Sequence, residues 1–306
     1  MLVSLNTFIF YRPSIMKYLL LLFTLFLPLL SFANPPILMP AWQSKAVLKQ
    51  PESVVYDAKR KQLYVSNVNG NPMEADGNGY ISTLSLTGEI ISQHFIDGLN
   101  APKGLAIFAD KLYVADINEL LVIDLSSSKI IQRYSAPNAK FLNDVETDNN
   151  GNIYVSGFLT NSIYRLSDGK FELWFQSEQL EVPNGLLVEG NQLRVASWGN
   201  MTDGFATAIP GHIKTINIAT KEIQSLGDKS PVGNLDGLES DNNGNYYATD
   251  WMAGTLLHIS PVGISETLVT LGQGSADLTV LPEQKLVIIP MMNSGYITAY
   301  TIKETQ

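Results

Sequence analysis

Short stretches of alternating apolar and polar residues recur along the chain, separated by turn sequences rich in Asn, Asp and Gly. Residues 145–157 (VETDNNGNIYVSG) and 238–250 (LESDNNGNYYATD) each predict two strands joined by a tight turn. No stretch keeps an apolar period of 3.6 residues, so we expect little helix. The pattern therefore predicts an all-β protein.

The strands belong to a unit that occurs six times. A second-strand motif begins at Tyr64 (YVSN), Tyr113 (YVAD), Tyr154 (YVSG), Arg194 (RVAS), Tyr247 (YATD) and Val287 (VIIP). The strand before it opens with a tripeptide whose central residues are Glu52, Lys103, Asn143, Asn184, Asp236 and Asp277, at spacings of 51, 40, 41, 52 and 41. A third strand follows in each unit, and a weaker fourth in most.

Six units of about 40–50 residues with four strands each predict a six-bladed β-propeller, with antiparallel blades around a central channel. Two β-sandwiches are the alternative, but they do not explain one tripeptide repeated six times. Residues 41–49 (AWQSKAVLK) are expected to add a strand that closes the ring.

Two units are longer than the others because each carries an insert between its second and third strands. The inserts are Asn67–Gly79 in unit one and Trp198–Gly211 in unit four. These units face each other across a six-fold ring. Loops on one face of a repeat fold often line its binding surface, but tolerated surface insertions explain the lengths equally well.

The six central tripeptide residues are expected to converge on the channel. Glu52, Asn143, Asn184 and Asp236 would bring carboxylate and amide oxygens together, and calcium prefers such ligands. The alternative is that each residue only caps a turn. Asp277 is a possible fifth oxygen-bearing residue, placed by its spacing.

Two tryptophans and three histidines are further candidates beside this set. Trp198 and Trp251 each follow a second strand, where they would wall the pocket or pack between blades. His94, His212 and His258 occur in outer-strand contexts and are expected to be structural or surface residues.

The chain resembles the SMP-30/gluconolactonase/regucalcin-like six-bladed propellers, which are related to the paraoxonase and diisopropylfluorophosphatase propellers. The resemblance covers about residues 45–303 and rests on PES at Pro51, LND at Leu142, PNGL at Pro183 and LDGL at Leu235. It implies that the matching Glu52, Asn143, Asn184 and Asp236 bind a catalytic divalent metal, usually calcium. It also implies that Asp236 is a base or nucleophile.

The chain departs from that family at two positions. Phe141 stands where regucalcin-like members carry an arginine, two residues before Asn143. Lys103 places a cation at the channel mouth, where it would oppose a metal by like-charge repulsion, pair with Asp277 or hold an anionic substrate.

The resulting hypothesis is an exported calcium-dependent hydrolase that acts on a lactone or ester. Asp236 would be catalytic, and Lys103, Asp277, Trp198 and Trp251 would contact a small-molecule substrate. The alternative is a non-catalytic periplasmic binding or scaffold propeller, in which Lys103 forms salt bridges with the acids and no metal is needed. Metal-free chemistry of the strictosidine-synthase kind on the same fold is a third, remote option.

The first 33 residues predict export. They contain no acid, and Met16-Lys-Tyr is followed by LLLLFTLFLPLLSFA, which indicates a signal peptide cut after Ala33. Residues 34–306 would then form the mature propeller, periplasmic or secreted and not inserted in a membrane. An uncleaved anchor is the alternative, and Met16 competes with Met1 as the true start.

The composition argues against several kinds of site and partner. The chain has no cysteine, which excludes disulfides, a thiol nucleophile and thiolate metal sites. Its formal charge of −9 disfavours nucleic-acid binding. The oligomeric state stays open.

Overall fold

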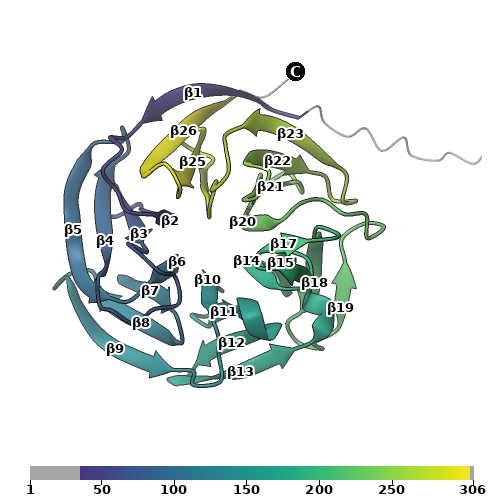
Figure 1. Cartoon of the computed structure of the whole chain (residues 1–306), viewed down its shortest axis with the longest axis horizontal. Helices are drawn as coiled ribbons and strands as arrows, with labels where there is room; N and C mark the ends of the chain where they lie inside the picture. The colour runs from purple at the N-terminus through teal and green to yellow at the C-terminus, as the bar shows by residue number, and fades with distance from the viewer. Residues whose placement is uncertain (1–34, 304–306) are drawn as a thin grey trace, which may run out of the picture. The chain divides into compact units, whose positions relative to one another are not determined.

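Six four-stranded antiparallel sheets stand around a central channel in residues 35–303, the part of the chain that the computed structural model describes (Figure 1). The predicted six-bladed β-propeller is confirmed. The predicted signal peptide lies outside the described residues. Within them, no helix has the length and apolar character needed to cross a membrane.

In the first five blades the strands follow chain order from the channel outward, and in the sixth the outer strand is β1. The innermost strands are β2 (Pro51–Asp57), β6 (Pro102–Phe108), β10 (Leu142–Thr147), β14 (Pro183–Glu189), β20 (Leu235–Ser240) and β24 (Thr279–Leu281). The second strands are β3 (Gln62–Asn67), β7 (Lys111–Asp116), β11 (Ile153–Gly157), β15 (Gln192–Ser197), β21 (Tyr246–Asp250) and β25 (Leu286–Met291). The third strands are β4 (Gly79–Ser85), β8 (Glu119–Asp124), β12 (Ser162–Ser167), β18 (Ile213–Asn217), β22 (Thr255–Ile259) and β26 (Tyr296–Lys303). The outer strands are β5 (Ile90–Leu99), β9 (Lys129–Ser135), β13 (Lys170–Gln176), β19 (Ile223–Ser225), β23 (Ser265–Thr270) and β1 (Ile37–Gln43).

The ring closes through the two ends of the described chain. Strand β1 pairs antiparallel with β26, so the first strand completes the blade that the last three strands begin. A closing strand was predicted, but residues 37–43 supply it rather than 41–49. The remaining elements are the hairpin β16 (Met201–Asp203) and β17 (Ala206–Thr207) in the second insert, and two short 3-10 turns, η1 (Phe158–Thr160) and η2 (Glu178–Leu180).

Apolar side chains fill the spaces between neighbouring blades. Among the described residues there are six buried clusters of this kind, one for each blade interface. Between the first two blades, for example, Tyr64 and Ile81 pack against Leu105 and Leu112. Burial of apolar area between blades supplies the main stabilising term, and no disulfide is required.

Strand register corrects one position in the predicted repeat. The first residue of each tripeptide pairs with the last residue of the next strand: Pro51 with Asn67, Pro102 with Asp116, Leu142 with Gly157, Pro183 with Ser197, and Leu235 with Asp250. In the sixth blade the matching bridge joins Ser275 to Met291. Ala276 therefore holds the central position, and the equivalence predicted for Asp277 is wrong by one residue.

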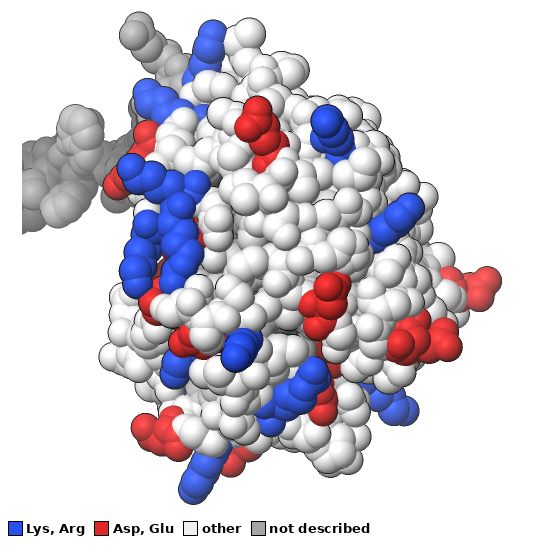
Figure 2. All heavy atoms as spheres, turned by 90° about the vertical axis from the view of Figure 1, so that its left-hand side faces the viewer, with Lys and Arg blue, Asp and Glu red and all other residues white. Residues whose placement is uncertain are grey.

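Charged side chains of both signs are scattered over the outer surface at the left of Figure 1, with wide uncharged areas between them (Figure 2). Some charged residues in the described part of the chain form surface pairs, such as Lys59 with Asp110 and Arg133 with Glu119. Exposed pairs contribute little to stability.

Candidate active site

A cavity of about 230 Å³ opens at one end of the channel. Its buried polar side chains include Glu52, Asn143, Asn184 and Asp236, each no more than 5% exposed. The structure thus brings together all four predicted metal ligands. The other lining residues are Gln50, Val68, Pro72, Lys103, Phe141, Phe158, Trp198, Phe205, Trp251, Met292 and Asn293.

The backbone directs these side chains into the cavity by a feature that recurs. Antiparallel pairing is interrupted between Pro51 and Val54, and at the matching places in the next four blades. Such bulges re-aim side chains, often beside active sites. The glycine after the central residue has a steric reason: a Cβ on Gly185 would lie 2.2 Å from the carbonyl oxygen of Asp236.

Two oxygens in the cavity are buried without a hydrogen-bond partner. The side-chain amide of Asn184 donates to Asp236 Oδ1 at 3.1 Å, which leaves Asn184 Oδ1 unpaired. Glu52 Oε2 is unpaired as well. An unpaired buried polar atom costs about 1–3 kcal/mol in proteins, so these two oxygens point to a missing partner.

The two carboxyl groups are electrostatically strained. Burial raises the pKa of Glu52 well above its usual value, and Asp236 and Asp277 raise it further, while Lys103 opposes the shift. Burial and Asp277 likewise raise the pKa of Asp236, and the hydrogen bond from Asn184 opposes this. A bound cation would relieve both effects.

The donor set fits a hard divalent metal. Two carboxylates and two amide oxygens supply ligands that calcium accepts, with positions left for water or substrate. In residues 35–303, no group of three or more His, Asp or Glu side chains could hold a metal ion. A metal in this cavity would therefore depend on Asn143 and Asn184.

Lys103 does not pair with the acids. Its ammonium donates to the carbonyl oxygens of Ala101 at 2.8 Å and Pro72 at 3.1 Å, and lies 4.4 Å from the centre of the Phe141 ring. Of the options for Lys103, the pair with Asp277 is wrong, since no ion pair within residues 35–303 includes Lys103. Burial lowers the pKa of Lys103 to about 8, while Glu52 and Asp116 oppose the shift.

Aromatic side chains form much of the wall. Trp198 and Trp251 both line the cavity with ring centres 6.0 Å apart, where the sequence placed them. The sequence did not identify Phe141, Phe158 or Phe205 as wall residues. Phe205 lies in the second insert, and this insert was the feature of the sequence that could have indicated it.

Both inserts reach the cavity. Val68 and Pro72 come from the first, and Phe205 comes from the second. The reading in which the inserts line a binding surface is thus supported by their positions. Whether Lys103, Trp198 and Trp251 contact a substrate stays a prediction.

A second cavity of about 200 Å³ borders the innermost strands and is lined by a different set of acids from the cavity that holds Glu52. Asp144, Glu146, Glu239 and Asp277 line it. Asp277 therefore belongs to this cavity and not to the cavity with Glu52. The sequence signal for Glu146 and Glu239 was their equivalent place in VETD and LESD, within otherwise apolar strands.

The acids of the second cavity have hydrogen-bond donors. Asp144 accepts from the backbone amides of Val145 at 2.7 Å and Leu186 at 2.6 Å, and Ser53 Oγ donates to Asp277 Oδ2 at 2.6 Å. Backbone amides on the neighbouring blade also donate to Glu146 and Glu239. These carboxyl groups therefore connect adjacent innermost strands.

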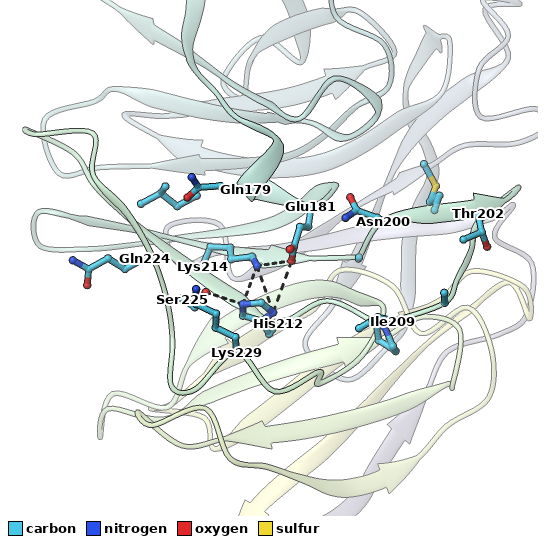
Figure 3. Close-up of a pocket in the computed structure, with 15 residues that line it drawn as sticks. Gln179, Glu181, Asn200, Thr202, Ile209, His212, Lys214, Gln224, Ser225 and Lys229 are labelled. Carbon is cyan, nitrogen blue, oxygen red and sulfur yellow. Dashed lines mark hydrogen bonds and ion pairs between the residues drawn. The ribbon is translucent and has the colours of Figure 1, made fainter.

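A third, wider pocket of about 750 Å³ lies on the fourth blade, away from the four predicted ligands (Figure 3). Lys214 points at Glu181 and at the His212 ring, and Ser225 Oγ lies 2.9 Å from His212 Nε2. Burial and the neighbouring Lys214 lower the pKa of His212. These polar groups satisfy one another.

All three histidines lie on third or outer strands or beside them, as predicted. His94 is in β5 and contacts Asp97 at 2.7 Å, and His258 is in β22, 3.4 Å from Asp241. His212 precedes β18. None of the three lines the cavity that holds Glu52 and Asp236.

Comparison with known proteins defines the class. The model of the SMP-30/gluconolactonase/LRE-like region matches residues 50–275, so the chain belongs to that family. A gluconolactonase from Xanthomonas campestris has a similar structure, with a TM-score of 0.65, 14% identity, and coverage of 89% of this chain and 99% of that one.

A virginiamycin B lyase from Staphylococcus aureus is also similar, with a TM-score of 0.58, 13% identity, and coverage of 87% and 98%. At these identities the two structures share the fold with this chain. A search of curated protein sequences finds no significant match.

Proposed function

We propose that the chain is an exported calcium-dependent hydrolase of the gluconolactonase type, which opens a lactone or a related ester in the cavity that holds Glu52. The observation that carries the proposal is the pair of buried, unpartnered oxygens, Glu52 Oε2 and Asn184 Oδ1, next to Asp236. Family membership supports the same class of reaction.

Glu52, Asn143, Asn184 and Asp236 would hold the metal. When bound, calcium supplies Lewis-acid polarisation of a substrate carbonyl. Asp236 would take a proton from attacking water, because its carboxyl group lines the cavity beside the unpaired Asn184 oxygen. The Asn184 side-chain amide fixes the orientation of that carboxyl group through its hydrogen bond.

Lys103 has a proton available for the leaving oxygen. Two of its three N–H groups are bound to carbonyl oxygens, which leaves one for a ligand in the cavity. In hydrolysis, the water oxygen bonds to the carbonyl carbon and the bond to the ring oxygen breaks. The ring oxygen takes a proton and a hydroxy acid is released. A pKa of about 8 suits a donor for this step near neutral pH.

The alternative of a non-catalytic propeller required Lys103 to neutralise the acids. Lys103 binds backbone carbonyls instead and only partly offsets the cost of burying Glu52, whose pKa stays well above its usual value. That cost is the reason to prefer a ligand-binding site.

The proposal is tested by thermal unfolding of residues 34–306 in calcium and in EDTA. A ligand at 100 times its dissociation constant adds about 2.7 kcal/mol, which corresponds to about 5–10 °C in melting temperature. Asn184→Ala should remove the shift, and the exposed turn variant Asn149→Ala should keep it. No shift at millimolar calcium would contradict the metal site.

Export has its own test. The acid-free, apolar first 33 residues support a periplasmic or secreted location. Protein recovered from that compartment should begin at Asn34. A full-length chain retained in the cell would contradict cleavage.

A further inference from the structure

The upper wall of the cavity offers apolar surface and few free hydrogen-bonding groups. Rings of Phe141, Phe158, Trp198 and Phe205 contact one another, with centres 5.3–6.3 Å apart. Met292 and Pro72 complete this wall. Unpaired polar atoms occur at the other side of the cavity, on Glu52 and Asn184.

Several polar atoms near the wall are already engaged by the protein. Trp198 Nε1 donates to the Phe205 carbonyl oxygen at 2.9 Å. Gln50 Oε1 accepts from the Gly70 amide at 2.6 Å, and Asn293 Nδ2 donates to the Gln273 carbonyl oxygen at 3.1 Å. A substrate hydroxyl placed against the four aromatic rings would lose water without gaining a partner there, at about tenfold or more in affinity for each hydroxyl.

We infer that the substrate is a small lactone or ester carrying an aromatic or alkyl group, and that polyhydroxylated sugar lactones are poor substrates. The inference rests on the proposed hydrolase function. The ester carbonyl would face Asn184 and Asp236, and the apolar group would pack between Phe205 and Trp251. A volume of about 230 Å³ is below the range of about 300–1,000 Å³ for drug-sized ligands, so one ring with a short substituent fits.

Lys103 agrees with this orientation. The Lys103 ammonium lies 4.4 Å from the centre of the Phe141 ring and donates to two carbonyl oxygens. Lys103 therefore presents one free donor to the cavity and not an open cationic surface. One donor suits an ester or ring oxygen. A carboxylate-bearing substrate would also bring a negative charge close to Glu52 and Asp236.

The first experiment compares kcat/KM for three δ-lactones in the presence of calcium: dihydrocoumarin, δ-valerolactone and D-glucono-δ-lactone. We expect kcat/KM for dihydrocoumarin to exceed that for D-glucono-δ-lactone by at least about 100-fold. The reason is that two or more hydroxyl groups of D-glucono-δ-lactone would lose their hydrogen-bond partners. Equal or faster turnover of D-glucono-δ-lactone would overturn the inference and leave the proposed function intact.

The second experiment uses variants of the insert. Phe205 is 43% exposed and lies on a loop, so Phe205→Ala should fold. It should lower kcat/KM for dihydrocoumarin about tenfold and leave δ-valerolactone within about twofold, as expected for a lost aromatic contact. Ile209→Ala is the matched control, because Ile209 is exposed in the same insert but lines the pocket of Figure 3 instead. Equal losses on both lactones would count against a wall contact.

A binding measurement separates the two proposals. The lactam analogue of dihydrocoumarin is not hydrolysed under these conditions, and Trp198 and Trp251 should report its binding by fluorescence. Saturable binding, weakened in Phe205→Ala, without turnover of any lactone would support the apolar site and reject the hydrolase. Turnover of D-glucono-δ-lactone without lactam binding would reject the apolar substrate class only.

Discussion

The two cavities of the channel use the same kind of residue for different purposes. In the cavity that holds Glu52 and Asp236, carboxyl groups lie beside an unpaired amide oxygen and under an aromatic wall. In the cavity that holds Asp144 and Asp277, backbone amides and a serine hydroxyl donate to the acids.

The difference shows that burial of an acid does not by itself identify a functional residue. Burial raises the pKa in both cavities, for Glu52 and Asp236 as for Asp144 and Glu146. What separates them is the kind of partner: backbone amides and a serine hydroxyl donate to Asp144 and Asp277, whereas Asp236 accepts from the Asn184 side-chain amide and Glu52 Oε2 has no partner. The acids of the second cavity thus connect innermost strands, and the unpaired oxygens of the first cavity are the ones that the proposed function assigns to a ligand.

The largest expected effect is on catalysis at the first cavity. Asp236→Asn should lower kcat by about 100-fold or more, the usual contribution of a general base. In EDTA the variant should unfold at the same temperature as the wild type or higher, because it removes a buried charge. Asp203→Asn, on the exposed insert, is the control. Retained activity in Asp236→Asn would assign the base elsewhere.

A loss of stability comes next, at the second cavity. Asp144→Ala should reduce the free energy of unfolding by about 2–4 kcal/mol, because two buried amides, of Val145 and Leu186, lose their acceptor. Urea denaturation measures the change. Glu172→Ala, exposed on β13, should change it by less than about 0.5 kcal/mol. A neutral Asp144→Ala variant would show that the acid does not join the blades.

The smallest effect is a pH dependence. Burial raises the pKa of Glu146 from its usual 4.5 to about 8. The folded protein therefore binds this proton more tightly than the unfolded chain. The resulting stability is complete below pH 4.5 and disappears as the pH rises to about 8. Glu146→Gln should unfold at the wild-type temperature at pH 4.5.

At pH 8.5 we expect Glu146→Gln to melt about 2–4 °C higher than the wild type, equivalent to about 1 kcal/mol. Thermal scans at the two pH values, with Glu172→Gln as the control, measure the difference. An equal offset at both pH values would contradict titration of Glu146 as its cause.

The sequence predicted the ring and four members of the site because both depend on a repeat. PES, LND, PNG and LDG mark one backbone position, and the strand pairing confirms it in those blades. In the sixth blade the prediction was wrong by one residue, because Asp277 directly follows Ala276. Only the backbone hydrogen bonding distinguishes the two registers.

Other parts of the site were not accessible from the pattern. The partners of Lys103 are backbone carbonyls, which every residue has, so its side chain gave no indication of them. Phe141 was noted only as a departure from the family. Its place above Lys103 depends on a backbone φ of 63°, which is uncommon for a bulky residue.

The pairing of β1 with β26 makes the first and last described strands neighbours. Every contact inside a blade can form while the chain is incomplete, but this pair needs residues 37–43 and 296–303 together. The ring thus has one seam, whose two sides are separated by nearly the whole sequence. Closure of the seam is expected to be a late, slow event in folding, because distant segments must meet. A tag on β1, or its truncation, would hinder closure of the ring without changing any residue of the other five blades.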